Sequence, residues 1–205
     1  FYQASSSEMF GKNFDTRLIP KTPEECKGVC SDLPQMKKEK YQDEETKFMP
    51  QSPYAIAKCA AHHMTRLFRE AYGLHASAGI LFNHEGPRRG ENFVTRKITM
   101  AVARIKAGLQ SEIWMGNLDS IRDWGYAPEY TEGMWGMLQA DEPQDFVLAT
   151  GTAYTIKDFL EFSFAHVGLS WEEFVRFDPK FLRPTEVDEL IGDASKAEQI
   201  LGWKA

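Results

Sequence analysis

Residues 52–73, SPYAIAKCAAHHMTRLFREAYG, and residues 75–82, HASAGILF, decide the fold of this chain. The first segment predicts a helix, because a Ser-Pro pair suits a helix start and Gly73 suits a helix end. The second segment is short and largely apolar, which indicates a buried strand. Apolar side chains recur at helical spacing in the first segment. They are Tyr54, Ala57, Ala61, Met64, Phe68 and Ala71.

The same alternation of strand and helix extends in both directions from this stretch. An alternating order of this kind is typical of an α/β fold with a parallel sheet. Further strands are expected at residues 1–4, 112–115 and 145–149. Further helices are expected at residues 95–107, from Pro128 onward, at 155–168 with a Thr155/Asp158 capping box, and at 195–201 before Gly202.

Composition narrows the function classes. The 205 residues are 42% apolar and 26% charged, which is ordinary for a globular protein. The formal net charge of -6 argues against nucleic-acid binding. No apolar run approaches the roughly 20 residues that cross a bilayer, so no membrane span is expected.

Cysteine usage favours a reducing compartment, and we expect a cytoplasmic protein. Cys26, Cys30 and Cys59 are odd in number and form no disulfide framework. Cys26 and Cys30 have no second ligand pair at metal-binding spacing, so they are expected to be free thiols and no metal is predicted.

Residues 12–47 form a polar stretch with several prolines and little hydrophobic periodicity. The sequence predicts a long loop insertion. Long loops inside domains often have functional roles. A lid, a partner-binding segment and disorder all remain open.

Tyr54 and Lys58 lie one helical turn apart, and therefore on one face. A tyrosine pKa near roughly 10 makes a poor base at neutral pH, but a nearby ammonium group favours the phenolate. Such a pair can act as a general base beside a nicotinamide. The spacing alone is weak evidence, since in many helices the Tyr packs and the Lys is solvated. Its position after Ser52-Pro53, downstream of a strand that ends in Ser5-Ser6-Ser7, strengthens the interpretation.

Together these motifs resemble the extended short-chain dehydrogenase/reductases and, within them, the GDP-mannose 4,6-dehydratases. The resemblance covers nearly the whole chain except about residues 12–47. The matching segments are residues 4–11, 52–58, 79–90, 93–99, 116–125, 181–187, 192–197 and 201–204.

The resemblance implies a Rossmann-like, doubly wound parallel sheet, of which only the C-terminal part is present, with a smaller α/β substrate-binding domain. No G-x-G-x-x-G turn occurs, so we expect a fragment without its N-terminal nucleotide-binding half. Residues 1–83 and about 125–165 would belong to the NADP-binding domain. Residues about 84–124 and 166–205 would form an interleaved GDP-sugar domain.

The resemblance also implies catalytic roles. Tyr54 would deprotonate the C4 hydroxyl of GDP-mannose, and Lys58 would bind the nicotinamide ribose of NADP. Glu8 would remove the C5 proton, and Ser6 with Glu8 would help water to leave from C6. The product would be GDP-4-dehydro-6-deoxy-mannose, and the cofactor would be regenerated in each turnover.

Binding residues follow by the same matching. Tyr54 and Lys58 would contact NADP, and so would His84 and Arg89, although His84 alone would more simply be a core histidine. The residues that match the GDP-sugar pocket are Asn83, Val94, Lys97, Arg122, Arg183 and Glu186. A homodimer or homotetramer is implied as well.

Three alternatives stay open. The chain could act on another nucleotide sugar such as a GDP-heptose, or it could be an epimerase or reductase of the same fold. It could also be a noncatalytic relative, although the presence of Glu8, Tyr54 and Lys58 counts against that.

Overall fold

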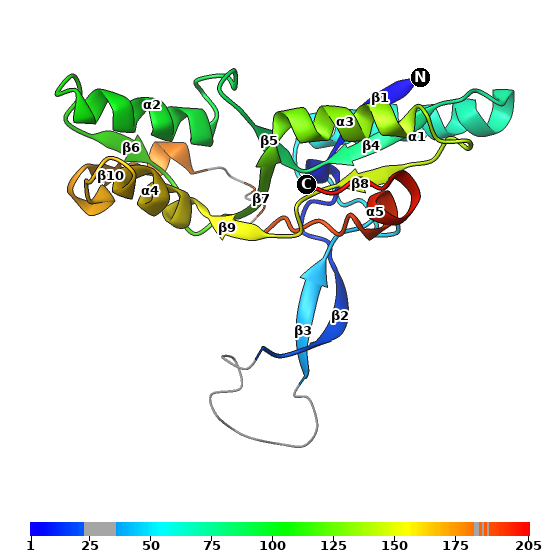
Figure 1. Ribbon diagram of the computed structural model, residues 1–205, viewed down its shortest axis with the longest axis horizontal. Helices are drawn as coiled ribbons and strands as arrows, with labels where there is room; N and C mark the ends of the chain where they lie inside the picture. Colours follow the sequence, from blue (N-terminus) through cyan, green and yellow to red (C-terminus); the bar gives the residue numbers. More distant parts are fainter. Residues whose placement is uncertain (23–35, 183–184, 186, 188) are drawn as a thin grey trace.

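A computed structural model describes residues 1–22, 36–182, 185, 187 and 189–205. Figure 1 shows two lobes, each built from helices and strands, and a two-stranded hairpin that projects away from them. The positions of Arg183, Glu186, Cys26 and Cys30 lie outside the described residues. Nothing in the structure therefore bears on the roles expected for them.

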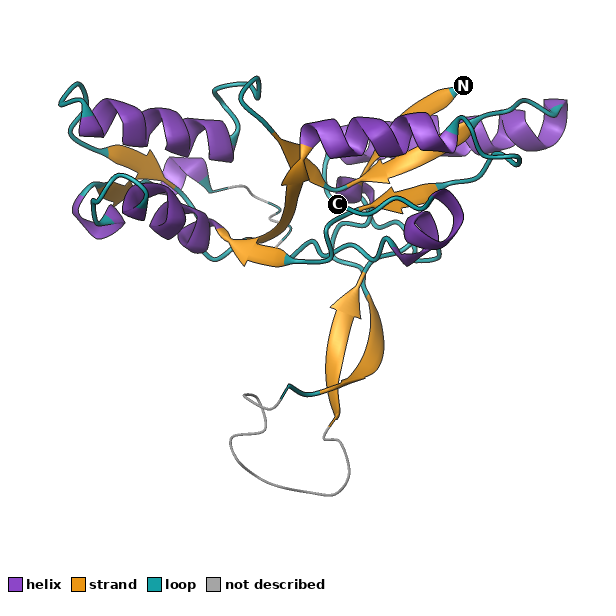
Figure 2. Cartoon of the chain, viewed as in Figure 1, coloured by secondary structure: helices purple, strands orange, loops and turns teal. Residues whose placement is uncertain are grey.

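The first lobe contains a parallel sheet in the order β1-β4-β8 (Figure 2). Its strands are β1 (Tyr2–Ser6), β4 (Ser77–Leu81) and β8 (Phe146–Leu148). β4 is buried along its whole length, as its apolar run predicts. Three helices pack against the sheet, namely α1 (Pro53–Tyr72), α3 (Ala127–Met137) and α5 (Ser195–Leu201). The expected α/β fold with a parallel sheet is confirmed.

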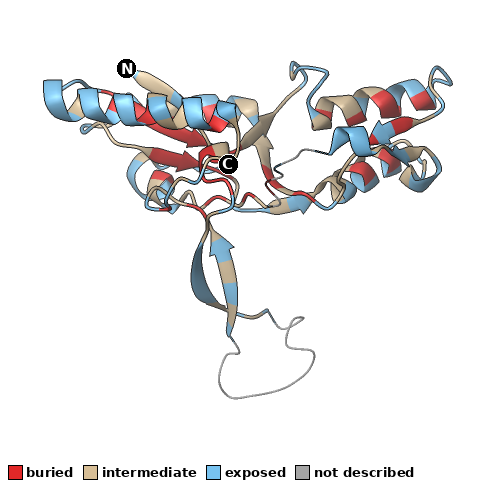
Figure 3. Ribbon diagram, turned by 180° about the vertical axis from the view of Figure 1, so that it is seen from behind, coloured by how far each residue is buried: buried red, intermediate tan, exposed pale blue. Residues whose placement is uncertain are grey.

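Helix α1 has the predicted ends. The Ser52 hydroxyl accepts a hydrogen bond from the Ala55 amide at 3.1 Å, and Gly73 closes the helix with φ of 63°. The apolar periodicity was not a guide to the buried face, however. The buried residues are Ala55, His62 and Thr65, whereas the apolar series is largely exposed (Figure 3).

The second lobe packs two helices against a pair of parallel strands. Its core joins the apolar faces of α2 and α4, including Ile98 and Phe164. The helices are α2 (Val94–Lys106) and α4 (Ile156–Ala165), and the strands are β6 (Ile113–Met115) and β10 (Val175–Phe177). Thr155 and Asp158 cap α4 reciprocally, as the sequence predicts.

A third, mixed sheet in the order β5-β7-β9 runs between the lobes (Figure 1). Its strands are β5 (Asn83–Glu85), β7 (Ile121–Tyr126) and β9 (Ala153–Thr155). None of the three was expected as a separate strand, because each is short or mixed in polarity.

Packing divides the chain differently from the expected domain ranges. Helix α4, expected in the cofactor domain, shares its core with α2 in the second lobe. Helix α5 and Trp203, expected in the sugar domain, pack with Tyr130 and Leu148 in the first lobe. Each segment follows the apolar face that it must bury, and sequence order does not reveal that partner.

The insertion expected at residues 12–47 has regular structure in its described part. It contains an antiparallel hairpin of β2 (Asp15–Pro20) and β3 (Met36–Tyr41). Most side chains of the hairpin are exposed or half-buried. No buried face had to be encoded, so the strands left no apolar alternation in the sequence.

None of the helices that the structure describes is both long and apolar enough to span a bilayer. Among the same residues, no group of three or more His, Cys, Asp or Glu side chains is placed to hold a metal ion. Cys59 is a half-buried free thiol.

Candidate active site

The carboxyl end of β1 turns directly into a short 3-10 helix, η1 (Ser7–Met9). Ser6 caps this turn, because its hydroxyl accepts a hydrogen bond from the Glu8 amide at 3.3 Å. Ser7 is buried beneath it, while Ser6 and Glu8 stay half-buried. Ser6 and Glu8 thus lie two residues apart on the turn where a parallel strand ends.

Helix α1 brings the second half of the site to β1. The Lys58 ammonium donates a hydrogen bond to the carbonyl oxygen of Ala4 at 2.8 Å. Its nitrogen lies 5.6 Å from the centroid of the Tyr54 ring. Tyr54 is 56% exposed.

The start of α1 and the turn η1 are also joined to each other. The Met49 amide donates to the carbonyl oxygen of Met9 at 2.9 Å. Gly11 makes this approach possible, since a Cβ there would lie 1.9 Å from the Met49 carbonyl oxygen. Gly11 also has φ of 58°, a conformation that favours glycine. The expected catalytic residues therefore occupy one junction of β1, η1 and α1.

The donor set at this junction suits the ribose end of a nicotinamide dinucleotide. An ammonium group has three N–H donors. Among the described residues, Lys58 directs one of them to Ala4, which leaves others for ribose hydroxyls. Tyr54 and Ser6 add hydroxyl groups, and Glu8 adds a carboxylate.

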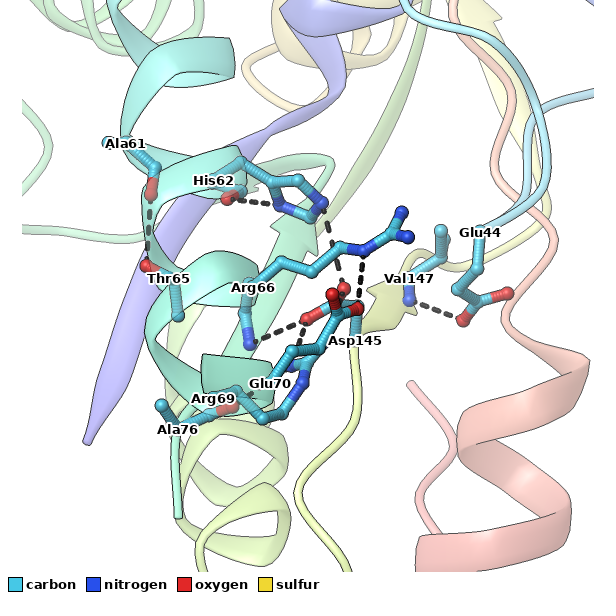
Figure 4. A network of polar contacts seen from close by, with 12 residues as sticks. Glu44, Ala61, His62, Thr65, Arg66, Arg69, Glu70, Ala76, Asp145 and Val147 are labelled. Atoms are coloured by element: carbon cyan, nitrogen blue, oxygen red, sulfur yellow. Dashed lines mark hydrogen bonds and ion pairs between the residues drawn. The ribbon is translucent and has the colours of Figure 1, made fainter. Parts of the chain in front are cut away.

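A polar network connects β1 and α1 with Asp145, the residue before β8 (Figure 4). The Ser5 hydroxyl lies 3.0 Å from Nδ1 of buried His62, and Nε2 of His62 lies 3.7 Å from the Asp145 carboxylate. Arg69 binds both oxygens of Asp145, at 2.8 and 3.0 Å. Burial lowers the pKa of His62 although Asp145 opposes that change, and the Arg69 hydrogen bonds help to hold the pKa of Asp145 low against burial. The sequence alone does not predict this network, because its members are far apart in the chain.

The two residues expected at the cofactor lie near β5. His84 Nδ1 is 2.8 Å from the carbonyl oxygen of Phe82, and its ring stacks on Tyr130 at 5.0 Å. Arg89 lies 3.1 Å from the Glu85 carboxylate and covers the Phe93 ring at 3.6 Å. His84 thus has the packing of a satisfied histidine, the simpler of its two interpretations.

Four of the six residues expected to bind the sugar nucleotide lie in the described part of the chain, on β5, α2 and β7. Asn83 pairs with Trp124 between β5 and β7, and Val94 begins α2. Lys97 donates to the carbonyl oxygen of Trp114 at 2.5 Å and lies 4.1 Å from the Phe181 ring centroid. Burial, followed by repulsion from Lys180, lowers the pKa of Lys97.

Arg122 is buried in β7 and donates to the carbonyl oxygen of Ile121 at 2.8 Å. Its neighbour Asp123 is fully buried and accepts hydrogen bonds from the amides of Thr150 and Gly151, in the loop after β8, each at 2.9 Å. Burial raises the pKa of Asp123, although these hydrogen bonds oppose that shift. Asp123 was not predicted, because one acid within a strand gives no periodic pattern.

The structure thus forms two groups from the predicted residues. Ser6, Glu8, Tyr54 and Lys58 lie at the first junction. A second group is distributed over β5, α2 and β7. Thr185 links the C-terminal segment to the first group, since its hydroxyl donates to the carbonyl oxygen of Gln51 at 2.8 Å.

Comparison with known sequences gives consistent matches. A family model described as GDP-mannose 4,6 dehydratase matches residues 35–205. The chain is 53% identical over 204 residues to GDP-mannose 4,6 dehydratase 1 of Arabidopsis thaliana, a match that covers 100% of this chain and 50% of that protein. It is 46% identical over 221 residues to the human GDP-mannose 4,6 dehydratase, covering 100% and 53% respectively. The chain therefore spans about half the length of the curated relatives that it matches.

Solved structures agree on the fold. RMD from Pseudomonas aeruginosa, solved with NADPH, superposes with a TM-score of 0.77 at 21% identity, covering 100% of this chain and 60% of that one. A dTDP-glucose 4,6-dehydratase from Bacillus anthracis, solved with NAD, gives 0.76 at 16% identity, covering 99% and 55%. At these identities the likeness shows the Rossmann-like architecture alone.

Proposed function

The chain belongs to the GDP-mannose 4,6-dehydratase family, and from that premise we propose that the complete protein converts GDP-mannose into GDP-4-dehydro-6-deoxy-mannose. The observation that carries the proposal is the junction of β1 with α1. There Lys58 binds the Ala4 carbonyl oxygen, Tyr54 lies one turn away, and Ser6 and Glu8 follow on the adjoining turn.

The residues at this junction divide the chemistry of the proposed reaction. Tyr54 takes the proton of the C4 hydroxyl as C4 is oxidised to a ketone. The ketone acidifies the C5 proton, which Glu8 removes. Hydroxide then leaves from C6 as water, protonated with help from Ser6 and Glu8. Addition of hydride at C6 and of a proton at C5 completes the product.

The proposed cofactor is NADP. When bound, it takes the hydride from C4 and returns it to C6, so that no net oxidation results. Lys58 would hold its ribose hydroxyls, and His84 and Arg89 would lie beside it. Structural relatives support a nicotinamide dinucleotide in general, since one was solved with NADPH and another with NAD.

The GDP part of the substrate is proposed to lie against the second group. Lys97 and Arg122 suit a diphosphate, because ammonium and guanidinium groups both donate hydrogen bonds to phosphate oxygens. Asn83 and Val94 lie on the elements beside them. Arg183 and Glu186 are carried over from the family motif alone.

Two further expectations belong to this proposal. We propose a homodimer or homotetramer, because the resemblance to the family implies one. We also propose a cytoplasmic location, in which the free thiol of Cys59 would remain reduced.

The deciding experiment incubates the complete protein with GDP-mannose and NADP⁺ and resolves the products by mass. A product that has lost one water, without net formation of NADPH, supports the proposal. Net NADPH formation would indicate a dehydrogenase that oxidises the sugar without returning the hydride. An isomer of unchanged mass would indicate an epimerase.

A further inference from the structure

The projecting hairpin is tied at its base to one distant segment, residues 189–193. The Lys40 ammonium lies 2.8 Å from the Glu189 carboxylate, and the Arg17 guanidinium binds the Asp193 carboxylate. The backbone of Gln42 completes the link. Its amide donates to the carbonyl oxygen of Ile191 at 2.9 Å, and its own carbonyl oxygen accepts from the Asp193 amide at 2.9 Å.

The same segment is bonded to β7 on both sides of Arg122. The Leu190 amide donates to the carbonyl oxygen of Ile121 at 3.2 Å. The Gly192 amide lies 3.3 Å from the buried Asp123 carboxylate. Gly192 packs closely against the body, because a Cβ there would lie 2.1 Å from the Ala149 side chain. A displacement of residues 189–193 would therefore also shift the backbone of β7 at Arg122.

Polar contacts, rather than apolar packing, hold the hairpin against the body. Leu18 and Met36, the large apolar side chains of its strands, are 63% and 45% exposed. A cavity of about 210 Å³ lies beside its base, lined in part by Arg17, Lys40 and Asp193. The ion pairs join exposed cations to carboxylates that are only 12% and 21% exposed. Arg17 also pairs with Glu39 across the hairpin, and Asp193 also accepts hydrogen bonds from Ser195.

We propose that the β2–β3 hairpin is a clamp that positions Arg122 for the GDP part of the substrate, with Arg17 and Lys40 as positioning residues. Neither residue touches the substrate in this arrangement. The clamp rests on the proposed function, in which Arg122 contacts the GDP-sugar. It gives a role to the insertion at residues 12–47.

The test compares the complete wild-type protein with the double variant Arg17→Ala/Lys40→Ala. Exposed ion pairs contribute modestly, so we expect the KM for GDP-mannose and the Kd for GDP to rise roughly three- to tenfold. The turnover number and the affinity for NADP⁺ should change by less than about twofold. The matched control is Lys12→Ala/Lys38→Ala, which removes the same charge from exposed lysines that have no side-chain partner among the described residues. It should leave the KM unchanged.

A charge exchange separates positioning from a general loss of stability. Lys40→Glu and Glu189→Lys should each raise the Kd for GDP, because each places like charges together. The combined variant Lys40→Glu/Glu189→Lys should restore the Kd to within about twofold. An unchanged Kd in all three variants, or a combined variant no better than either single change, would overturn the clamp.

Hydrogen–deuterium exchange makes the clamp testable apart from catalysis. The peptide containing residues 189–193 should exchange faster in Arg17→Ala/Lys40→Ala and at the wild-type rate in the control. If wild-type protein failed to dehydrate GDP-mannose, the proposed function would fall while this exchange result still decided the link between hairpin and segment. Equal exchange in the variant and the wild type would refute that link whatever the activity.

Discussion

Single residues at the β1–α1 junction are assigned separate steps, and the assignment can be tested step by step. Tyr54→Phe removes the group that takes the C4 proton, so no ketone and no transient reduced cofactor should form. Glu8→Gln leaves that oxidation intact but removes the base for C5. Each change should lower turnover by roughly 10²–10⁴-fold while GDP binding stays unchanged.

Two measurements separate the roles. Rapid mixing should detect transient reduced cofactor with Glu8→Gln but not with Tyr54→Phe. Uptake of solvent deuterium at C5 should disappear in both variants. Wild-type turnover in either variant would remove that residue from the mechanism.

Buried His62 predicts a loss of stability in mild acid. Its pKa is lowered in the folded state, chiefly by burial, so below its ordinary value the unfolded chain binds a proton that the folded chain resists. The free energy of unfolding should therefore be fully retained above about pH 6.5 and fall as the pH drops toward the folded-state pKa. Every tenfold loss of proton affinity on folding corresponds to about 1.4 kcal/mol.

Urea unfolding between pH 7 and pH 5 measures this effect. His62→Gln should flatten the dependence of unfolding free energy on pH over that range. Equal slopes in His62→Gln and the wild type would show that another group titrates.

The sequence predicts site residues that lie close together in the chain. It does not predict site residues whose partners are distant in the sequence. Tyr54 and Lys58 could be paired because one helical turn joins them. Asp123 and His62 could not be predicted, because their hydrogen-bond partners are distant in the sequence. Asp123 accepts from Thr150, after β8, and His62 is bonded to Ser5 in β1. Their burial is a property of the tertiary structure.

Among the elements, α4 depends most clearly on a local sequence signal. Thr155 and Asp158 satisfy two backbone amides at its start, each through the other residue's side chain. Thr155→Ala should lower the free energy of unfolding by about 1 kcal/mol, because the Asp158 amide at the half-buried helix start loses its acceptor. Thr155→Ser keeps the hydroxyl and should cost much less. Denaturant unfolding of both variants checks the difference, and equal losses would assign the effect to the lost methyl group instead.

Elements with strong end signals were predicted well, and those without them were missed. Helices α1, α3 and α5 begin or end near Pro or Gly at the expected positions. The hairpin of β2 and β3 was missed because its stability lies in cross-strand hydrogen bonds and ion pairs, which leave no apolar period. β7 was missed because it mixes a buried Asp and Arg with its apolar residues.

At the scale of the whole molecule, α1 carries an apolar stripe that is exposed to solvent. We define this stripe as Met64, Phe68 and Tyr72. These side chains lie one turn apart and are 55%, 42% and 69% exposed. Exposed apolar patches often mark interfaces. In the proposed homo-oligomer this stripe is the surface that we expect a second copy to cover.

Light scattering on the complete protein tests that expectation. Met64→Glu/Phe68→Glu should lower the measured mass by half or more, because charges would replace apolar contacts. Arg104→Glu, an exposed change on α2, should keep the wild-type mass. An undiminished mass in the first variant would place the interface elsewhere.

The position of β1 at the end of the order β1-β4-β8 has a practical consequence. Among the described residues, β1 is paired on one side only, and an unpaired strand edge can recruit strands from other chains. Expressed as these 205 residues alone, the protein would present Tyr2–Ser6 as a template for aggregation. A preparation should therefore stay dispersed only while this edge of β1 is covered or paired.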